Sequence, residues 1–178
     1  SELDPTAEDP DANSTSSQYL MRFVTSKSFI DDIFSSDLGI SFNHIEREFF
    51  NYPDFLADTF QSTQDTGKRF KIESRSDLSI GKKHKLIFGI EYEHESQDNT
   101  QFANFSGFVI QGGSKETAIT KTVYLQNIYN FSEDSSIISD IRHDKNTRFD
   151  GETTYRVSPV FYFPSLDIRL RGAYGTGH

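Results

Sequence analysis

The 178-residue sequence contains no cysteine and no tryptophan. Without cysteine there is no disulfide framework, no thiolate metal cluster and no cysteine nucleophile. Basic residues are also few, since 18 Lys and Arg stand against 27 Asp and Glu and leave a formal net charge of -9. A nucleic-acid-binding surface needs clustered Lys and Arg to neutralise phosphates, so nucleic acid is excluded as a principal partner.

Long hydrophobic runs are missing as well. No stretch approaches the roughly 18–20 consecutive apolar residues of a membrane helix, which excludes a helical membrane protein. A membrane β-barrel is not excluded, because its strands alternate between apolar and polar residues. Aromatic residues are abundant instead: there are 17 Phe and 8 Tyr, although hydrophobic residues reach only 34% in total. Because aromatic side chains are enriched in strands, this imbalance favours a β protein.

The first 16 residues stand apart from the rest of the chain. Residues 1–16 hold five acidic residues, two prolines and no basic residue, which indicates an acidic loop or tail. Calcium takes about 6–8 oxygen ligands, often from flexible loops. Four acidic residues could supply such ligands: Asp4, Glu8, Asp9 and Asp11. A solvated acidic tail is the alternative, and no other cofactor is expected.

Period-two alternation is clearest in residues 69–80. One side, from Phe70 to Ile80, is apolar or small, whereas the other, beginning at Arg69, is almost entirely charged. A short turn at 81–84 leads into residues 85–95, which repeat the pattern with only Ile87 breaking it. The two runs therefore predict a hairpin.

The same construction recurs on both sides of this hairpin and predicts an all-β fold, an antiparallel up-and-down meander of about eight strands. The expected strands are 17–27, 34–48, 69–80, 85–95, 117–131, 136–148, 152–163 and 167–175. Short links separate the members of each hairpin, whereas two longer links, 49–64 and 96–116, are expected to be loops.

Alternation alone does not distinguish a soluble sandwich from a barrel, but strand length and link length do. Sandwich strands average about 5–6 residues, while a tilted membrane crossing needs about 9–11, the range these runs reach. Short turns on one edge and long loops on the other are typical of an outer-membrane barrel. We expect residues 17–178 to form a segment of a transmembrane β-barrel that meets lipid; a soluble β-sandwich or barrel binding module is the alternative.

The C-terminal third carries a family resemblance. The runs Asp140-Ile-Arg-His-Asp144, Phe149 to Ser158 (FDGETTYRVS) and Arg169 to Gly177 (RLRGAYGTG) resemble, in this order and spacing, the barrel of TonB-dependent outer-membrane receptors, nearest the cobalamin-receptor branch. The resemblance implies a bacterial outer-membrane receptor that imports a scarce bulky ligand such as cobalamin or a siderophore. In an intact receptor, the further partners would be a plug domain, TonB and that small chelate ligand.

The length departs from that family, whose transporters have about 22 strands. Spread over 178 residues, 22 strands would average about 8 residues without loops, too few to cross a bilayer. The resemblance therefore implies a barrel fragment without the plug domain, and a small stand-alone outer-membrane protein is the alternative.

Enzyme hypotheses find little support. The five histidines lack metal-ligand spacing, and no nucleophile elbow or phosphate loop occurs, so no catalytic residue is expected. Glu91 and Glu93 share a strand face, as a glycosidase pair does, but Lys and Arg nearby favour an ion-pair ladder.

Ligand contact is instead expected from aromatic side chains of the two long links, because exposed rings suit stacking on a large ligand. Packing of these loops on one another is the alternative. The candidates are Phe49, Phe50, Tyr52, Phe55, Phe60, Phe102, Phe105 and Phe108.

Overall fold

The computed structural model describes residues 12–30, 33–53 and 59–177. Within these ranges there is no helix, and so none that is long and apolar enough to cross a membrane. The strands are β1 (Ala12–Phe29), β2 (Phe34–Asn51), β3 (Thr59–Ile80), β4 (His84–Phe105), β5 (Phe108–Asn130), β6 (Ser136–Asn146), β7 (Glu152–Phe163), β8 (Ile168–Arg171) and β9 (Tyr174–Gly175).

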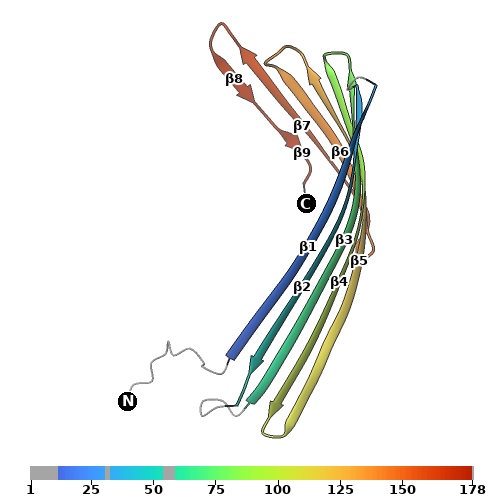
Figure 1. Cartoon of the computed structure of the whole chain (residues 1–178). Coiled ribbons are helices and arrows are strands. Elements are labelled where there is room, and N and C mark those ends of the chain that lie inside the picture. Colours follow the sequence, from blue (N-terminus) through green and yellow to red (C-terminus); the bar gives the residue numbers. More distant parts are fainter. Residues whose placement is uncertain (1–11, 31–32, 54–58, 178) are drawn as a thin grey trace. The chain divides into compact units, whose positions relative to one another are not determined.

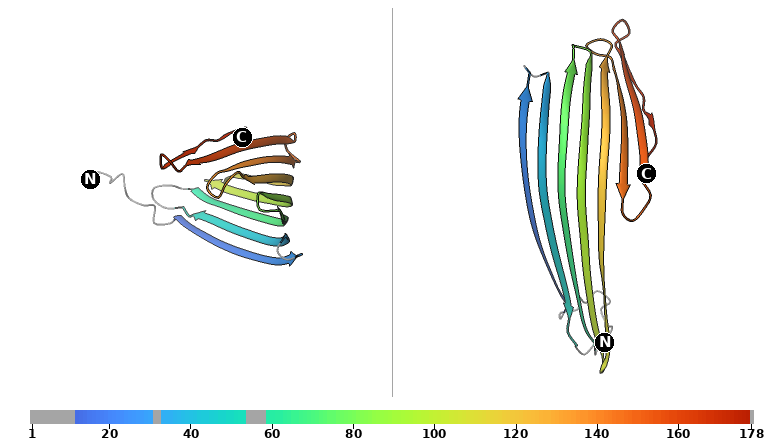
Figure 2. Two further views of the ribbon diagram at one scale, coloured as in Figure 1. Left: turned by 90° about the horizontal axis from the view of Figure 1, so that it is seen from above. Right: turned by 90° about the vertical axis from the view of Figure 1, so that its right-hand side faces the viewer.

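These strands form one sheet in chain order from β1 to β8, with β9 paired to β7 (Figures 1 and 2). β5, β6, β7 and their successors pair antiparallel, as the predicted meander requires. β8 and β9 follow one register along β7, since Val160 faces Arg171 and Val157 faces Tyr174. The break between them falls opposite Pro159, which has no N–H for the ladder. Counted as one interrupted strand, β8 and β9 bring the total to the predicted eight.

The prediction that 49–64 and 96–116 are long loops is wrong. β4 continues to Phe105 and β5 starts at Phe108, so these strands have 22 and 23 residues. Ser106 and Gly107 alone connect them, with φ angles of 48° and 92°. Positive φ at both central residues is the signature of a type I′ turn, whose twist matches that of the flanking strands.

The first strand also begins before the boundary that was predicted at residue 16 between the acidic tail and the barrel segment. β1 begins at Ala12, so residues 12–16 are strand and not tail. Residues 1–11 lie outside the described part of the chain, and the predicted acidic tail is untested there.

The chain divides into two compact units. Unit 1 comprises Ser1–Met21, Phe42–Arg69 and Glu95–Thr117; unit 2 comprises Arg22–Ser41, Phe70–His94 and Ala118–His178. Strands β1 to β5 contribute residues to both units, whereas β6 to β9 belong to unit 2 alone.

Unit 2 has one apolar and one ionic sheet face. Phe70, Phe88 and Ile90 occupy alternate positions on the apolar face and are 39%, 45% and 61% exposed. On the opposite face Ile87 is 6% exposed and is the only buried hydrophobic side chain among the described residues. An apolar face left uncovered by a second layer does not fit a soluble sandwich, whose apolar face packs into a dry core.

Candidate functional site

The ionic face of unit 2 is built around Lys71. Its ammonium lies 2.8 Å from Glu73 on the same strand and 3.2 Å from Glu91 on β4. Arg22 of β1 reaches the other side of Glu73 at 3.0 Å. Alternation places these residues on one face, and cross-strand neighbours of opposite charge then meet. The predicted ion-pair ladder is confirmed, and it engages Glu91 with two bases rather than leaving it as half of a catalytic pair.

The ladder continues onto β6. Arg142 lies 3.8 Å from Glu91 and 2.7 Å from Asp144, and Thr122 donates its hydroxyl hydrogen to Asp144. The register pairs Thr122 with Asp144 and Tyr124 with Arg142, so β5 supplies the polar groups between β4 and β6. A guanidinium held by several acceptors presents a fixed direction to any ligand.

Smaller groups flank this ladder. Asp77 accepts from Arg75 at 3.1 Å and from Lys85 at 3.0 Å, joining β3 to β4. Arg156 of β7 binds Asp140 of β6 at 3.0 Å. Base and acid therefore alternate across β3, β4, β6 and β7 on the same face.

Tyr124 crosses this face over Gly89. A Cβ added at Gly89 would overlap the Tyr124 ring, so glycine leaves the room that the ring occupies above β4. The mid-strand glycine thus positions an aromatic ring among the charged groups.

A cavity of about 250 Å³ opens beside Tyr124. It presents three guanidinium groups, two carboxylates, a phenol and an amide, a set suited to polar or anionic ligand groups. Its lining residues are Arg75, Ile87, Glu91, Tyr124, Gln126, Asp140, Ile141, Arg142 and Arg156. Sequence analysis identified the charges of β3 and β4 but not the cavity. The position of the Tyr124 ring over Gly89 depends on how β4 and β5 are paired, which the sequence does not specify.

The predicted ligand-contact aromatics lie mostly in strands and only partly together. Tyr52, Phe60 and Phe102 form a row, with ring centroids 5.5 and 5.8 Å apart. Phe105 and Phe108 flank the Ser106-Gly107 turn and are exposed. Phe49 and Phe50 are in the last residues of β2, and Phe55 lies outside the described residues. Ring contacts within the row do not test ligand binding, so ligand contact by these aromatics stays a prediction.

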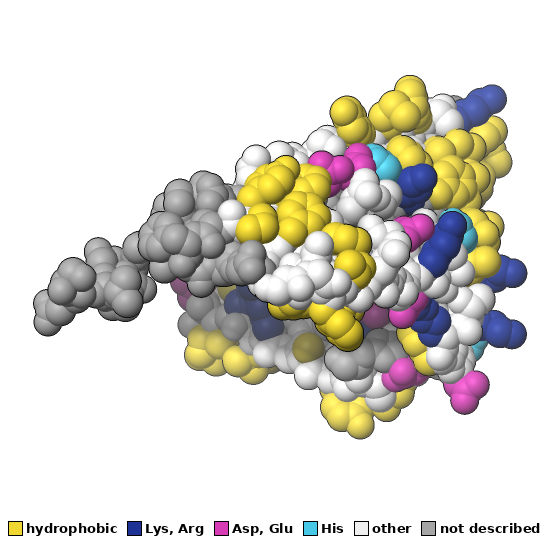
Figure 3. Space-filling view, turned by 90° about the horizontal axis from the view of Figure 1, so that it is seen from below, with side chains coloured by type: hydrophobic (Ala, Val, Ile, Leu, Met, Phe, Trp, Pro, Cys, Tyr) yellow, Lys and Arg dark blue, Asp and Glu magenta, His cyan; other side chains and the backbone are white. Residues whose placement is uncertain are grey.

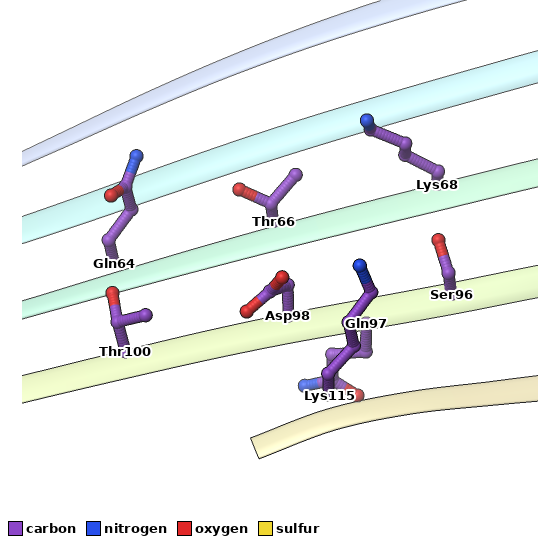
Figure 4. Close-up of a pocket in the computed structure, with 8 residues that line it drawn as sticks. All are labelled: Gln64, Thr66, Lys68, Ser96, Gln97, Asp98, Thr100 and Lys115. Atoms are coloured by element: carbon purple, nitrogen blue, oxygen red, sulfur yellow. The ribbon is translucent and has the colours of Figure 1, made fainter. Parts of the chain in front are cut away.

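Unit 1 holds a polar cavity of about 330 Å³ (Figure 4). Alternate residues of β3 and β4 supply most of its walls, and Lys115 of β5 completes it. The lining is Gln64, Thr66, Lys68, Ser96, Gln97, Asp98, Thr100 and Lys115. On the face seen from below, Figure 3 shows Lys, Arg, Asp and Glu side chains scattered among polar and hydrophobic ones rather than gathered in a patch of one sign. Sequence analysis did not predict this site, because the polar residues that line it do not alternate with apolar ones and so gave no strand signal.

The predicted calcium ligands Asp4, Glu8, Asp9 and Asp11 lie outside the described residues, so calcium binding there stays a prediction. Elsewhere, the residues that the structure describes contain no group of three or more His, Asp or Glu side chains placed to hold a metal.

The family model for the TonB dependent receptor-like β-barrel matches residues 3–178. The chain belongs to this family. Its sheet is accordingly a segment of a transmembrane β-barrel. No characterised protein matches the chain in sequence.

Solved structures share the fold. The copper transporter OprC is 11% identical, with a TM-score of 0.72 over 94% of this chain and 30% of that one. The RagAB peptide importer in its closed-closed state is 15% identical, with a TM-score of 0.63 over 92% of this chain and 22% of that one. The ferric yersiniabactin receptor FyuA from Yersinia pestis is 11% identical, with a TM-score of 0.62 over 92% and 28%. The chain thus spans less than a third of the length of these proteins.

Proposed function

We propose that this chain is part of a receptor in the bacterial outer membrane that imports a scarce, bulky ligand. Cobalamin and siderophores are the ligand classes we favour, because the block 140–177 resembles the cobalamin-receptor branch. In the complete receptor a plug domain would occupy the interior and TonB would supply energy. The RagAB peptide importer, the copper transporter OprC and the ferric yersiniabactin uptake receptor FyuA share this fold, which supports import in general.

The single observation behind the proposal is the division of unit 2 into an apolar face and an ionic face within a receptor barrel. The apolar face suits hydrocarbon, so the ionic face lines the interior that a ligand traverses. There Arg142 and Arg156 adjoin the cavity beside Tyr124. Guanidinium forks bind carboxylates and phosphates in two-point contacts, and both groups occur on bulky chelates.

Uptake in a strain lacking the gene tests this function. Cells complemented with the full gene product should accumulate radiolabelled cyanocobalamin or a ferric siderophore, and deletion of TonB should abolish the accumulation. Arg142→Met combined with Arg156→Met should lower uptake about tenfold or more, because two charge-assisted contacts are lost. Lys145→Gln, on the opposite face of β6, is the matched control and should leave uptake unchanged.

Two results would contradict the proposal. One is accumulation of neither ligand class by complemented cells that carry the protein in the outer membrane. The other is accumulation that persists without TonB, which would indicate a passive channel.

A further inference from the structure

The turn edge of unit 2 holds a cavity that the sites above do not use. It has a volume of about 330 Å³ and is lined by residues of the link from β3 to β4 and of the link from β5 to β6. Figure 1 shows both links at the same edge of the sheet. The N–H of Asn130, the last residue of β5, donates a hydrogen bond to the carbonyl of Lys83 in the first link at 2.8 Å. The lining residues are Lys82, Lys83, Asn130, Phe131, Ser132 and Glu133.

The charges in this cavity are not used within the fold. Lys82, Lys83 and Glu133 make no ion pair with a side chain in the described ranges. The neighbouring acid Asp134 differs, because Arg169 lies 3.7 Å from it. The cavity therefore offers two positive groups and one negative group to an external ligand.

An aromatic row borders the cavity on the apolar face. His84 stacks on Tyr129 at 4.5 Å, Tyr129 meets Phe131 at 4.8 Å, and Phe131 stacks on Phe161 at 5.8 Å. Tyr129, near the end of β5, lies in line with Leu125, an exposed apolar residue, and Phe131 follows directly after the strand. Aromatic rings at the end of an apolar band lie at the level of lipid headgroups. The two lysines just beyond the row are then at the level of lipid phosphates.

We propose that this cavity binds the headgroup of phosphatidylethanolamine. Lys82 and Lys83 hold the phosphate, Glu133 holds the ammonium, and Phe131 contacts the glycerol and the first acyl carbons. Phosphatidylglycerol would bring a phosphate but no cation for Glu133. The quaternary ammonium of phosphatidylcholine has no N–H to donate to a carboxylate. Of these three lipids, only the zwitterionic amine lipid therefore pairs with both the positive and the negative groups of the cavity.

Native mass spectrometry of the full gene product in detergent tests this assignment. The protein is offered an equal mixture of phosphatidylethanolamine, phosphatidylglycerol and phosphatidylcholine with identical acyl chains. We expect phosphatidylethanolamine to be retained in preference to the other two. Lys82→Gln with Lys83→Gln should reduce its retention about tenfold or more. Glu133→Gln should shift the preference to phosphatidylglycerol.

The matched control removes two other lysines of unit 2. Lys121 and Lys145 face each other across β5 and β6, near the other end of the unit 2 part of β5. Lys121→Gln with Lys145→Gln should leave retention unchanged. Equal losses in the two double variants, or a preference of the unmodified protein for phosphatidylglycerol, would overturn the proposal. Soluble phosphoethanolamine should bind at least about 100-fold more weakly than the lipid, because it lacks the acyl chains that contact the apolar face; equal binding would rule out a membrane lipid as the occupant.

Discussion

Units 1 and 2 share five strands but use different side-chain chemistry across them. In unit 2, acids and bases pair along one face, with Lys71 held between Glu73 and Glu91. In unit 1, amide groups make most of the cross-strand contacts: Gln18 donates to Asn43 at 3.0 Å and Gln64 to Glu46 at 2.9 Å. An ion pair also occurs there, at 3.7 Å between Arg69 and Glu95, the last and first residues of their unit 1 segments.

The opposite face explains the difference. In unit 2 that face is mostly apolar, as contact with lipid would require, and the ion-paired side chains lie on the other side of the sheet. In unit 1, β3 and β4 are rich in Gln, Asn, Thr and Ser on both faces, which suits strands with water on both sides. A single strand can thus meet two solvents, and its side-chain pattern changes where the solvent changes.

The largest effect should come from placing a charge on the apolar face. Phe88→Arg in unit 2 should destabilise the protein by about 2–4 kcal/mol, as expected for Arg near the bilayer midplane. Thr100 lies on the same side of β4 by alternation but in unit 1, and Thr100→Arg should change the free energy of unfolding by no more than about 0.5 kcal/mol. Urea unfolding of the full gene product in vesicles measures both. Similar losses at the two positions would mean that the face of unit 1 is also in hydrocarbon.

The next largest effect should come from filling the space that the Tyr124 ring occupies over Gly89 on the ionic face. Gly89→Ala should cost about 1–3 kcal/mol, because its Cβ overlaps the Tyr124 ring. Gly112→Ala in unit 1 meets nothing within 4 Å and should be neutral or slightly stabilising. The same unfolding assay applies, and Tyr124→Ala should remove the penalty of Gly89→Ala. A penalty that persists in that background would show that the ring is not its cause.

Sequence reasoning succeeded where alternation is strong. Residues 69–80 and 85–95 alternate with only Ile87 breaking the pattern, so both faces of the β3–β4 hairpin and the pairing of Glu91 with a base of β3 could be predicted. It failed in unit 1, because residues 96–101 are polar at successive positions and give no period-two signal even though they are strand. The dipeptide Ser106-Gly107 between two Phe residues was the available clue to a two-residue hairpin, since Gly supplies the positive φ that such turns need.

Other features depend on register and could not be predicted. The cavity beside Tyr124 requires knowing that β5 places this ring over Gly89 of the neighbouring strand. The break between β8 and β9 requires knowing that Pro159 lies opposite the interruption. Both follow from cross-strand pairing, which a one-residue slip would change completely.

A smaller effect distinguishes the two kinds of polar contact. Lys71 and Glu91 have side chains 23% and 19% exposed, and a double-mutant cycle with Met and Gln should give a coupling of about 1 kcal/mol. Raising NaCl from about 0.1 to 1 M shortens the screening length from about 10 to 3 Å and should reduce this coupling. The Gln18–Asn43 pair of unit 1 carries no charge, so its coupling should not respond to salt. A salt response of equal size in both pairs would contradict the distinction.

The smallest effect should come from the Ser106-Gly107 turn. Ser106 has a φ of 48°, a region in which Asn is favoured over most residues other than Gly, and Asn-Gly is the preferred type I′ pair. Ser106→Asn should therefore stabilise the β4–β5 hairpin by about 0.5 kcal/mol. Amide hydrogen exchange of the full gene product should slow in residues 95–117 by about twofold, while amides of β6 in unit 2 keep their rates. If β6 slowed equally, the two units would open together, and the chemical difference between them would not divide the protein into separately cooperative parts.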